Sequence, residues 1–202
     1  MAIEAFVFDF GNVICKFDKN IFLEKLTLHC DKTVAQLNKL IFCDTDICIK
    51  FECGQISGED YYKEIVEMCG LSIEQSEFFE AHTNIFTNIT ETFALIKRLK
   101  SKYKLGLLSN TCVWDFERGI KSVEVFSLFD AVTLSFEVGV MKPNKKIYDD
   151  MLNKIKLQPQ NCVYIDDIKE FTDAGNSLGF NAINYQGAEK LLKELQEMNI
   201  QF

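Results

Sequence analysis

Short, continuous apolar runs recur along this 202-residue chain and constrain its fold more than any other feature. The run at residues 5–8, Ala-Phe-Val-Phe, is apolar at every position rather than at every second one. Such a strand is buried on both faces, as in a parallel sheet that helices cover on both sides. Further runs predict strands at Lys104–Asn110, Asp130–Ser135, Asn161–Asp167 and Phe180–Tyr185.

Helical patterns fall between these runs, at residues 90–102, 145–154 and 187–198. In the first of them Phe93, Ile96 and Leu99 lie on one stripe, which is typical of a helix that packs on a core. Strands that alternate with helices predict an α/β fold with a doubly wound parallel sheet and right-handed crossovers.

A long stretch after the first strand breaks this alternation and lacks a clear strand. Two pairs in it, Ser57 with Asp60 and Ser72 with Gln75, look like capping boxes that open helices. We therefore predict a helical cap inserted over the carboxyl edge of the sheet. The expected domains are a core of residues 1–15 and 89–202 and a cap of residues 16–88.

Composition argues against several classes of partner. Hydrophobic residues make up 48% of the chain, enough for a sizeable core, and the net charge of −8 disfavours nucleic-acid binding. The apolar runs are far shorter than a bilayer-spanning helix. The eight cysteines include no C-x-x-C pair and are expected to be reduced thiols. We expect a cytoplasmic monomer or homodimer with neither a nucleic-acid nor a membrane partner.

Polar residues stand at the carboxyl ends of three predicted strands. They are Asp9, Ser109, Asn110, Asp166 and Asp167, and Lys142 follows the third strand shortly before a helix. Because ligands bind at this edge of an open parallel sheet, we expect these side chains to share one crevice. Each has a structural explanation, such as capping a turn or a helix N-terminus. Their joint occurrence in this order favours an active site.

The chemistry of this set indicates phosphoryl transfer. Carboxylates held close together repel each other, and Mg²⁺ relieves this repulsion because it prefers oxygen ligands. A carboxylate such as Asp9 can attack phosphorus and form an aspartyl-phosphate. Lys142 and groups of Ser109 and Asn110 can supply the donors and positive charge that the phosphoryl oxygens need. Gly11 is expected to allow the tight turn after Asp9.

The four motifs resemble those of the haloacid dehalogenase-like superfamily, subfamily I, over nearly the whole chain. They read FVFDFGNV, LGLLSNT, MKPNKKIY and VYIDD. The D-x-G-N-V and LSNT forms look most like a bacterial branch that includes sugar-phosphate phosphatases. The resemblance implies a Rossmann-like core and a magnesium-dependent phosphatase. Its substrate would be a small phosphorylated metabolite, such as a sugar phosphate, processed through an aspartyl-phosphate intermediate.

The resemblance also implies a metal site with Mg²⁺ as the cofactor. Asp9 would be both the nucleophile and a magnesium ligand. The Gly11 carbonyl and Asp167 would be further ligands, and Asp166 would orient Lys142 or a metal-bound water. Around the phosphoryl group, the resemblance assigns binding to Ser109 and Asn110 and charge stabilisation to Lys142.

The chain departs from the family pattern at three positions. Family phosphatases usually carry a second Asp, a general acid and base, where this chain has Gly11. Proton transfer of this kind contributes about 10²–10⁴-fold, so we expect a good leaving group such as an anomeric phosphate. Phe171 stands where related chains often have an Asn or Asp that supports the metal site. Asp173 lies two positions further along the chain and cannot directly replace that residue. Met141 stands where the nearest branch often has Arg.

Two alternatives remain open from the sequence. The first is a haloacid dehalogenase, which also lacks the second Asp and needs no metal. Such an enzyme requires an arginine that receives the halide, and the only two arginines of this chain, Arg98 and Arg118, are not next to any of the four motifs. A weakly active or non-catalytic scaffold that binds a phosphometabolite has little need for Asp9 beside a metal site. Cap aromatics are expected to be mostly core, although some would face the substrate. The candidates are Phe17, Phe22, Phe42, Phe51, Tyr61 and Tyr62, with Trp114 beside the second motif.

Overall fold

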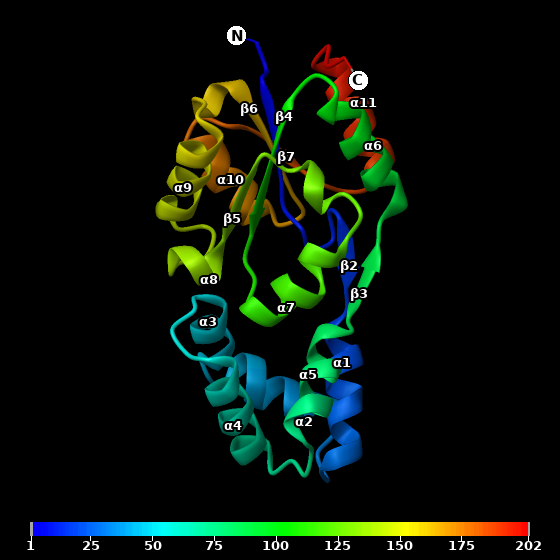
Figure 1. Ribbon diagram of the computed structural model, residues 1–202, viewed down its shortest axis with the longest axis vertical. Coiled ribbons are helices and arrows are strands. Elements are labelled where there is room, and N and C mark those ends of the chain that lie inside the picture. The colour runs from blue at the N-terminus through cyan, green and yellow to red at the C-terminus, as the bar shows by residue number, and fades with distance from the viewer. Residues whose placement is uncertain (1, 202) are drawn as a thin grey trace.

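The central sheet has five parallel strands in the order β5-β4-β1-β6-β7, in a computed structural model that describes residues 2–201 (Figure 1). The strands are β1 (Ala5–Phe8), β4 (Lys104–Ser109), β5 (Ala131–Leu134), β6 (Cys162–Asp166) and β7 (Asn181–Asn184). Each lies within one residue of its predicted ends. The predicted doubly wound α/β fold is confirmed.

Helices cover both faces of this sheet (Figure 1). They are α6 (Thr90–Lys100) and α11 (Ala188–Glu197) on one face, and α9 (Lys145–Ile155) and α10 (Lys169–Ser177) on the other. Phe6 and Phe8 of β1 pack towards the first pair, whereas Ala5 and Val7 pack towards α9. Because both faces of β1 are covered, its sequence is apolar at every position.

The remaining core elements are short. The helices α7 (Val113–Arg118) and α8 (Ser135–Val138) follow β4 and β5. Single helical turns lie at Ile120–Ser122, Phe126–Leu128 and Pro159–Asn161 in the core, and at Thr27–His29 and Lys39–Cys43 in the inserted stretch. Within the described part of the chain, no helix is both long and apolar enough to cross a membrane.

The inserted stretch forms a helical cap with its own apolar cluster, beneath the carboxyl ends of the strands in Figure 1. Its helices are α1 (Lys19–Leu26), α2 (Val34–Asn38), α3 (Ile47–Glu52), α4 (Gly58–Cys69) and α5 (Gln75–Thr83). The Ser57 hydroxyl caps α4 as predicted. The prediction for Ser72 is wrong, because Glu74 occupies the N-cap of α5 and makes no side-chain cap bond. The capping box belongs to Thr33, before α2.

The expectation that the insertion lacks strands is also wrong. The strand β2 (Cys15–Phe17) pairs antiparallel with β3 (Phe86–Asn88), where the chain leaves and re-enters the core (Figure 1). Runs of three residues carry too little alternation to be recognised in sequence. This ladder ties the two connections together and so fixes how the cap begins and ends.

Candidate active site

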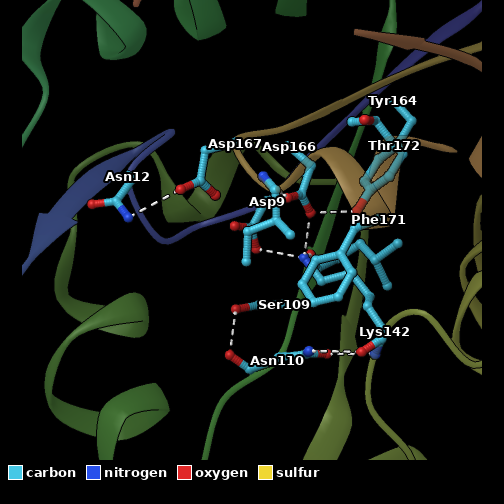
Figure 2. Close-up of polar contacts among 12 residues, drawn as sticks. Asp9, Asn12, Ser109, Asn110, Lys142, Tyr164, Asp166, Asp167, Phe171 and Thr172 are labelled. Carbon is cyan, nitrogen blue, oxygen red and sulfur yellow. Dashed lines mark hydrogen bonds and ion pairs between the residues drawn. The ribbon is translucent and has the colours of Figure 1, made fainter. Parts of the chain in front are cut away.

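The carboxyl ends of β1, β4 and β6 bring the predicted polar residues together (Figure 2). Asp9 directly follows β1, and its backbone N–H donates to the Ile165 carbonyl at 2.9 Å. Ser109 ends β4, Asp166 ends β6, and Asp167 is the next residue. Lys142 reaches the same edge from the loop before α9. Parallel strands therefore place side chains from distant parts of the sequence in one crevice.

Lys142 lies at the centre of this group. Its ammonium donates to Asp9 Oδ1 at 2.8 Å, to Asp166 Oδ2 at 2.6 Å and to the Leu108 carbonyl at 3.2 Å. Its side chain is 1% exposed. Burial opposes the charge, but the two carboxylates outweigh burial and raise the pKa of Lys142. Lys142 therefore stays charged at neutral pH, with all three of its donors in use.

Three carboxylates form a group that suits a hard divalent cation. Asp9, Asp166 and Asp167 each offer an oxygen within 4.8 Å of the others. Burial, although opposed by Lys142, raises the pKa of Asp9 to about 7. Burial also raises the pKa of Asp167, against a hydrogen bond from Asn12. A bound cation would offset this cost of burying negative charge, and an all-oxygen donor set fits Mg²⁺.

The turn after Asp9 differs from the expectation for Gly11. The residue with positive φ is Asn12, at 54°. A Cβ on Gly11 would lie 3.3 Å from two carbons of the Phe17 ring, so an aromatic side chain occupies the space beside this glycine. Asn12 also donates from Nδ2 to Asp167 Oδ2 at 3.1 Å. Sequence reasoning missed Asn12, which supports a carboxylate of the proposed metal site in the way expected of residue 171.

Two neighbouring residues of the second motif, Ser109 and Asn110, have different roles in the structure. The Asn110 side chain clamps the backbone of Lys142, accepting from its N–H at 2.7 Å and donating to its carbonyl at 3.2 Å. The Ser109 hydroxyl makes only a long contact of 3.3 Å to the Asn110 carbonyl. Ser109 can thus turn to a phosphoryl oxygen, whereas the Asn110 side chain positions Lys142.

Asp166 is held to orient Lys142. Its carboxylate accepts a short hydrogen bond from the Tyr164 hydroxyl, and the Ile168 N–H donates to it at 2.8 Å. Tyr164 was also missed, although it stands two residues before Asp166 and therefore on the same side of the strand. Phe171 places its ring 5.1 Å from Lys142 Nζ. Asp173 pairs with Lys169 at the surface and does not reach the site.

A cavity of about 400 Å³ lies between the core and the cap. Core residues line its floor, and among the described residues no arginine lines it. Its apolar walls include Phe17, Phe22, Phe42, Phe51, Tyr61, Phe86 and Met141. Tyr62 is not among the lining residues, and its hydroxyl donates to the Ile73 carbonyl. Trp114 packs against Phe51 and other cap rings instead of lining the cavity.

The cap side of the cavity also carries polar groups. Glu52 and His82 come from α3 and α5, and Asp115 comes from α7. His82 Nδ1 lies 3.2 Å from Asp115 Oδ1. Cys112 brings its thiol within 4.8 Å of both, a grouping that sequence spacing did not indicate. Lys19 of α1 also lines the cavity, so its cap side combines acidic and basic groups.

Comparisons with known proteins agree with this geometry. Residues 24–185 match the family described as haloacid dehalogenase-like hydrolase. The chain is 26% identical to a D-ribitol-5-phosphate phosphatase of Bacteroides thetaiotaomicron, over 96% of this chain and 97% of that protein. A glyceraldehyde 3-phosphate phosphatase of Methanothermobacter thermautotrophicus is 35% identical over 46% of this chain and 42% of its own length.

A solved structure has the same fold. It is a haloacid dehalogenase family enzyme of Bacteroides thetaiotaomicron in complex with magnesium and inorganic phosphate. Its TM-score is 0.82 at 21% identity, and the match covers 92% of this chain and 95% of that one.

Proposed function

The chain belongs to the haloacid dehalogenase-like hydrolase family, and from this membership and the site geometry we propose that it is a magnesium-dependent phosphatase. The observation that carries the proposal is the buried cluster in which Lys142 bonds Asp9 and Asp166, with Asp167 beside them. We further propose that residues 1–15 and 89–202 act as the catalytic core and residues 16–88 as the cap that encloses the substrate.

The substrate class we propose is a small phosphorylated polyol or sugar. Two relatives that carry the names of phosphatases act on ribitol 5-phosphate and glyceraldehyde 3-phosphate, which supports this class. A cavity of about 400 Å³ has room for a molecule of that size. The cap supplies apolar walls that exclude water from the reacting group.

The chain's own residues divide the work in the following way. Asp9 attacks phosphorus through a carboxylate oxygen, and Lys142 holds that carboxylate in place at 2.8 Å. Asp166 and Asn110 fix Lys142 from two sides, through its ammonium and its backbone. Ser109 turns its hydroxyl to a phosphoryl oxygen. Mg²⁺, held by Asp9, Asp167 and the Gly11 carbonyl, would neutralise charge on the phosphoryl oxygens.

Hydrolysis of p-nitrophenyl phosphate tests this proposal. We expect turnover with Mg²⁺, none with EDTA, and a loss of at least about 10³-fold in Asp9→Asn. Asp173→Asn, which removes an exposed carboxylate outside the site, is the matched control and should keep full activity. Metal-independent halide release from a 2-haloacid would instead support a dehalogenase. Phosphate binding without turnover of any phosphate ester would support a binding scaffold.

A further inference from the structure

The site has no acid where the family pattern places its proton donor, and an aromatic ring lies beside that position. The Phe17 ring lies 3.3 Å from where a Cβ on Gly11 would be. An aspartate there would require the ring to move. If the protein is the phosphatase proposed above, an alcohol leaving group still needs a proton. Groups on the other walls of the cavity are the candidates to supply this proton.

The cavity lining narrows the choice of donor. Asp9 and Asp167 belong to the nucleophile and the metal site. His82 and Asp115 face each other at 3.2 Å. Glu52 differs from these, because within residues 2–201 its carboxyl makes no hydrogen bond or ion pair with another side chain or with the backbone. A carboxyl that is left free inside a substrate cavity is available to the substrate.

The backbone of Glu52 is anchored where the cap meets the core. The Ser135 hydroxyl donates to the Glu52 carbonyl at 2.6 Å and accepts the Thr111 N–H at 2.8 Å. Thr111 follows Ser109 by two residues, so this contact ties the end of α3 to the loop that binds the phosphoryl group. Two residues further on, Gly54 lies directly against the Phe136 backbone. The position of Glu52 over the site is therefore set by the core and not by the cap alone.

The protonation of Glu52 suits a group that gives and takes a proton. Burial, reinforced by the negative charge of Asp115, raises the pKa of Glu52 to about 7, while His82 and Lys142 oppose the rise. The thiols that also interact with it are Cys48, Cys53 and Cys112. Near neutral pH both forms of the carboxyl are populated, which is the condition for efficient general acid and base catalysis.

We propose that Glu52, carried by the cap, is the general acid and base of this phosphatase in place of the acid missing at Gly11. In the first step Asp9 forms a bond to phosphorus as the bond to the leaving oxygen breaks, and protonated Glu52 gives its proton to that oxygen. The alcohol departs and Glu52 is left as a carboxylate.

In the second step Glu52 restores its proton. Its carboxylate takes a proton from water as the water oxygen attacks the aspartyl-phosphate. The bond between phosphorus and Asp9 breaks, phosphate leaves, and both side chains return to their starting states. With this donor present, the enzyme does not need an activated leaving group. The primary-alcohol phosphates in the names of its relatives become suitable substrates.

The test compares Glu52→Gln with the wild type on two substrates with Mg²⁺. Ribitol 5-phosphate releases an alcohol that needs a proton, whereas p-nitrophenyl phosphate releases a phenolate that does not. The ratio kcat/KM reports only the steps through release of this first product. We expect kcat/KM to fall by about 10²–10⁴-fold on ribitol 5-phosphate and by only a few fold on p-nitrophenyl phosphate.

A second readout concerns the second step. Because Glu52→Gln also lacks the base, p-nitrophenyl phosphate should give a burst of nitrophenol followed by slow turnover. In the wild type, kcat/KM for ribitol 5-phosphate should decline as pH rises through about 7, and this decline should vanish in the variant. Glu24→Gln, which changes an exposed cap carboxylate on α1, is the control and should match the wild type throughout.

Several outcomes would overturn the inference. Equal losses on both substrates would make Glu52 a structural or binding residue, and so would an unchanged pH profile. A selective loss in His82→Gln but not in Glu52→Gln would assign the proton to His82. A wild-type protein that hydrolyses neither substrate would refute the phosphatase proposal itself, together with this inference. Activity on both substrates with no effect of Glu52→Gln would refute the inference alone.

Discussion

At the scale of single residues, the site depends on one buried cation between two carboxylates. The side chains of Lys142 and Asp166 are 1% and 0% exposed, and Asp9 is 10% exposed. Charges this deeply buried are tolerable only while they remain paired. Removing the charged group of Lys142 leaves buried carboxylates without an opposite charge beside them. Such a change should therefore lower the stability of the fold.

Replacing Lys142 with Met tests that link. We expect a loss of about 3–5 kcal/mol in the free energy of unfolding at pH 7, because Asp9 and Asp166 become unpaired buried charges. The folded-state pKa of Asp9, already raised to about 7 beside Lys142, would rise further without that cation, so the loss should shrink as pH falls towards about 4 and this carboxyl takes a proton. Urea unfolding with EDTA at several pH values measures this. Lys145→Met, which breaks an exposed pair with Asp149, is the control.

Glu52 gives a pH dependence of its own, apart from catalysis. Its folded pKa of about 7 exceeds the unfolded value, so its contribution to stability is fully present below about pH 4.3 and is lost as pH rises through 7. Gln at this position does not titrate. Unfolding at increasing pH should show Glu52→Gln gaining stability relative to the wild type, by at most about 3 kcal/mol at pH 8. A constant difference between the two proteins from pH 5 to 8 would contradict the assigned pKa.

At the scale of elements, the contact between α3 and α8 joins the cap to the core. Gly54 has φ of 64°, and a Cβ there would lie 2.3 Å from the Phe136 carbonyl oxygen. This approach is too close for any other residue. Gly54 lies two residues after Glu52, the last residue of α3, so its contact with Phe136 helps to set the position of Glu52.

Comparing Gly54→Ala with Gly70→Ala separates the effect of the contact with Phe136 from the strain of placing Ala at a positive φ. Gly70 has a similar φ of 61°, but only Lys32 Nζ, at 3.6 Å, lies near its Cβ position. Gly70→Ala should cost about 1 kcal/mol and leave kcat/KM unchanged. Gly54→Ala should lower the free energy of unfolding by more than Gly70→Ala and should also lower kcat/KM, because the added methyl group prevents the cap from packing against α8. Thermal unfolding and steady-state kinetics would show equal effects if the contact had no role.

The elements differ in how far sequence could predict them. The five sheet strands agree with their predicted ends within one residue. Burial on both faces makes β1 apolar throughout, whereas the edge strand β7, Asn-Ala-Ile-Asn, is only partly buried and gives a weaker signal. The ladder of β2 and β3 was missed, since three residues show no period. The capping box was assigned to Ser72 although Thr33 forms one. Both have the required residue types, and only the backbone direction at the helix start distinguishes them.

At the scale of the whole molecule, the site is assembled from segments that lie far apart in the chain. The motif order predicted that Asp9, Lys142 and Asp167 lie near each other, because the carboxyl ends of parallel strands meet at one edge. The way the cap packs on the core could not be predicted. The position of Glu52 depends on contacts with Ser135 and Phe136, more than 80 positions later in the sequence, and no local pattern records such contacts.

Trapping the phosphorylated enzyme tests whether Asp9 is the nucleophile. Wild-type protein mixed with p-nitrophenyl phosphate and Mg²⁺, quenched in acid and digested, would be analysed by mass spectrometry. We expect one phosphoryl group on the peptide that contains Asp9, a larger phosphorylated fraction in Glu52→Gln, and none in Asp9→Asn. Phosphate release with no phosphorylated peptide, or with the group on another residue, would contradict it.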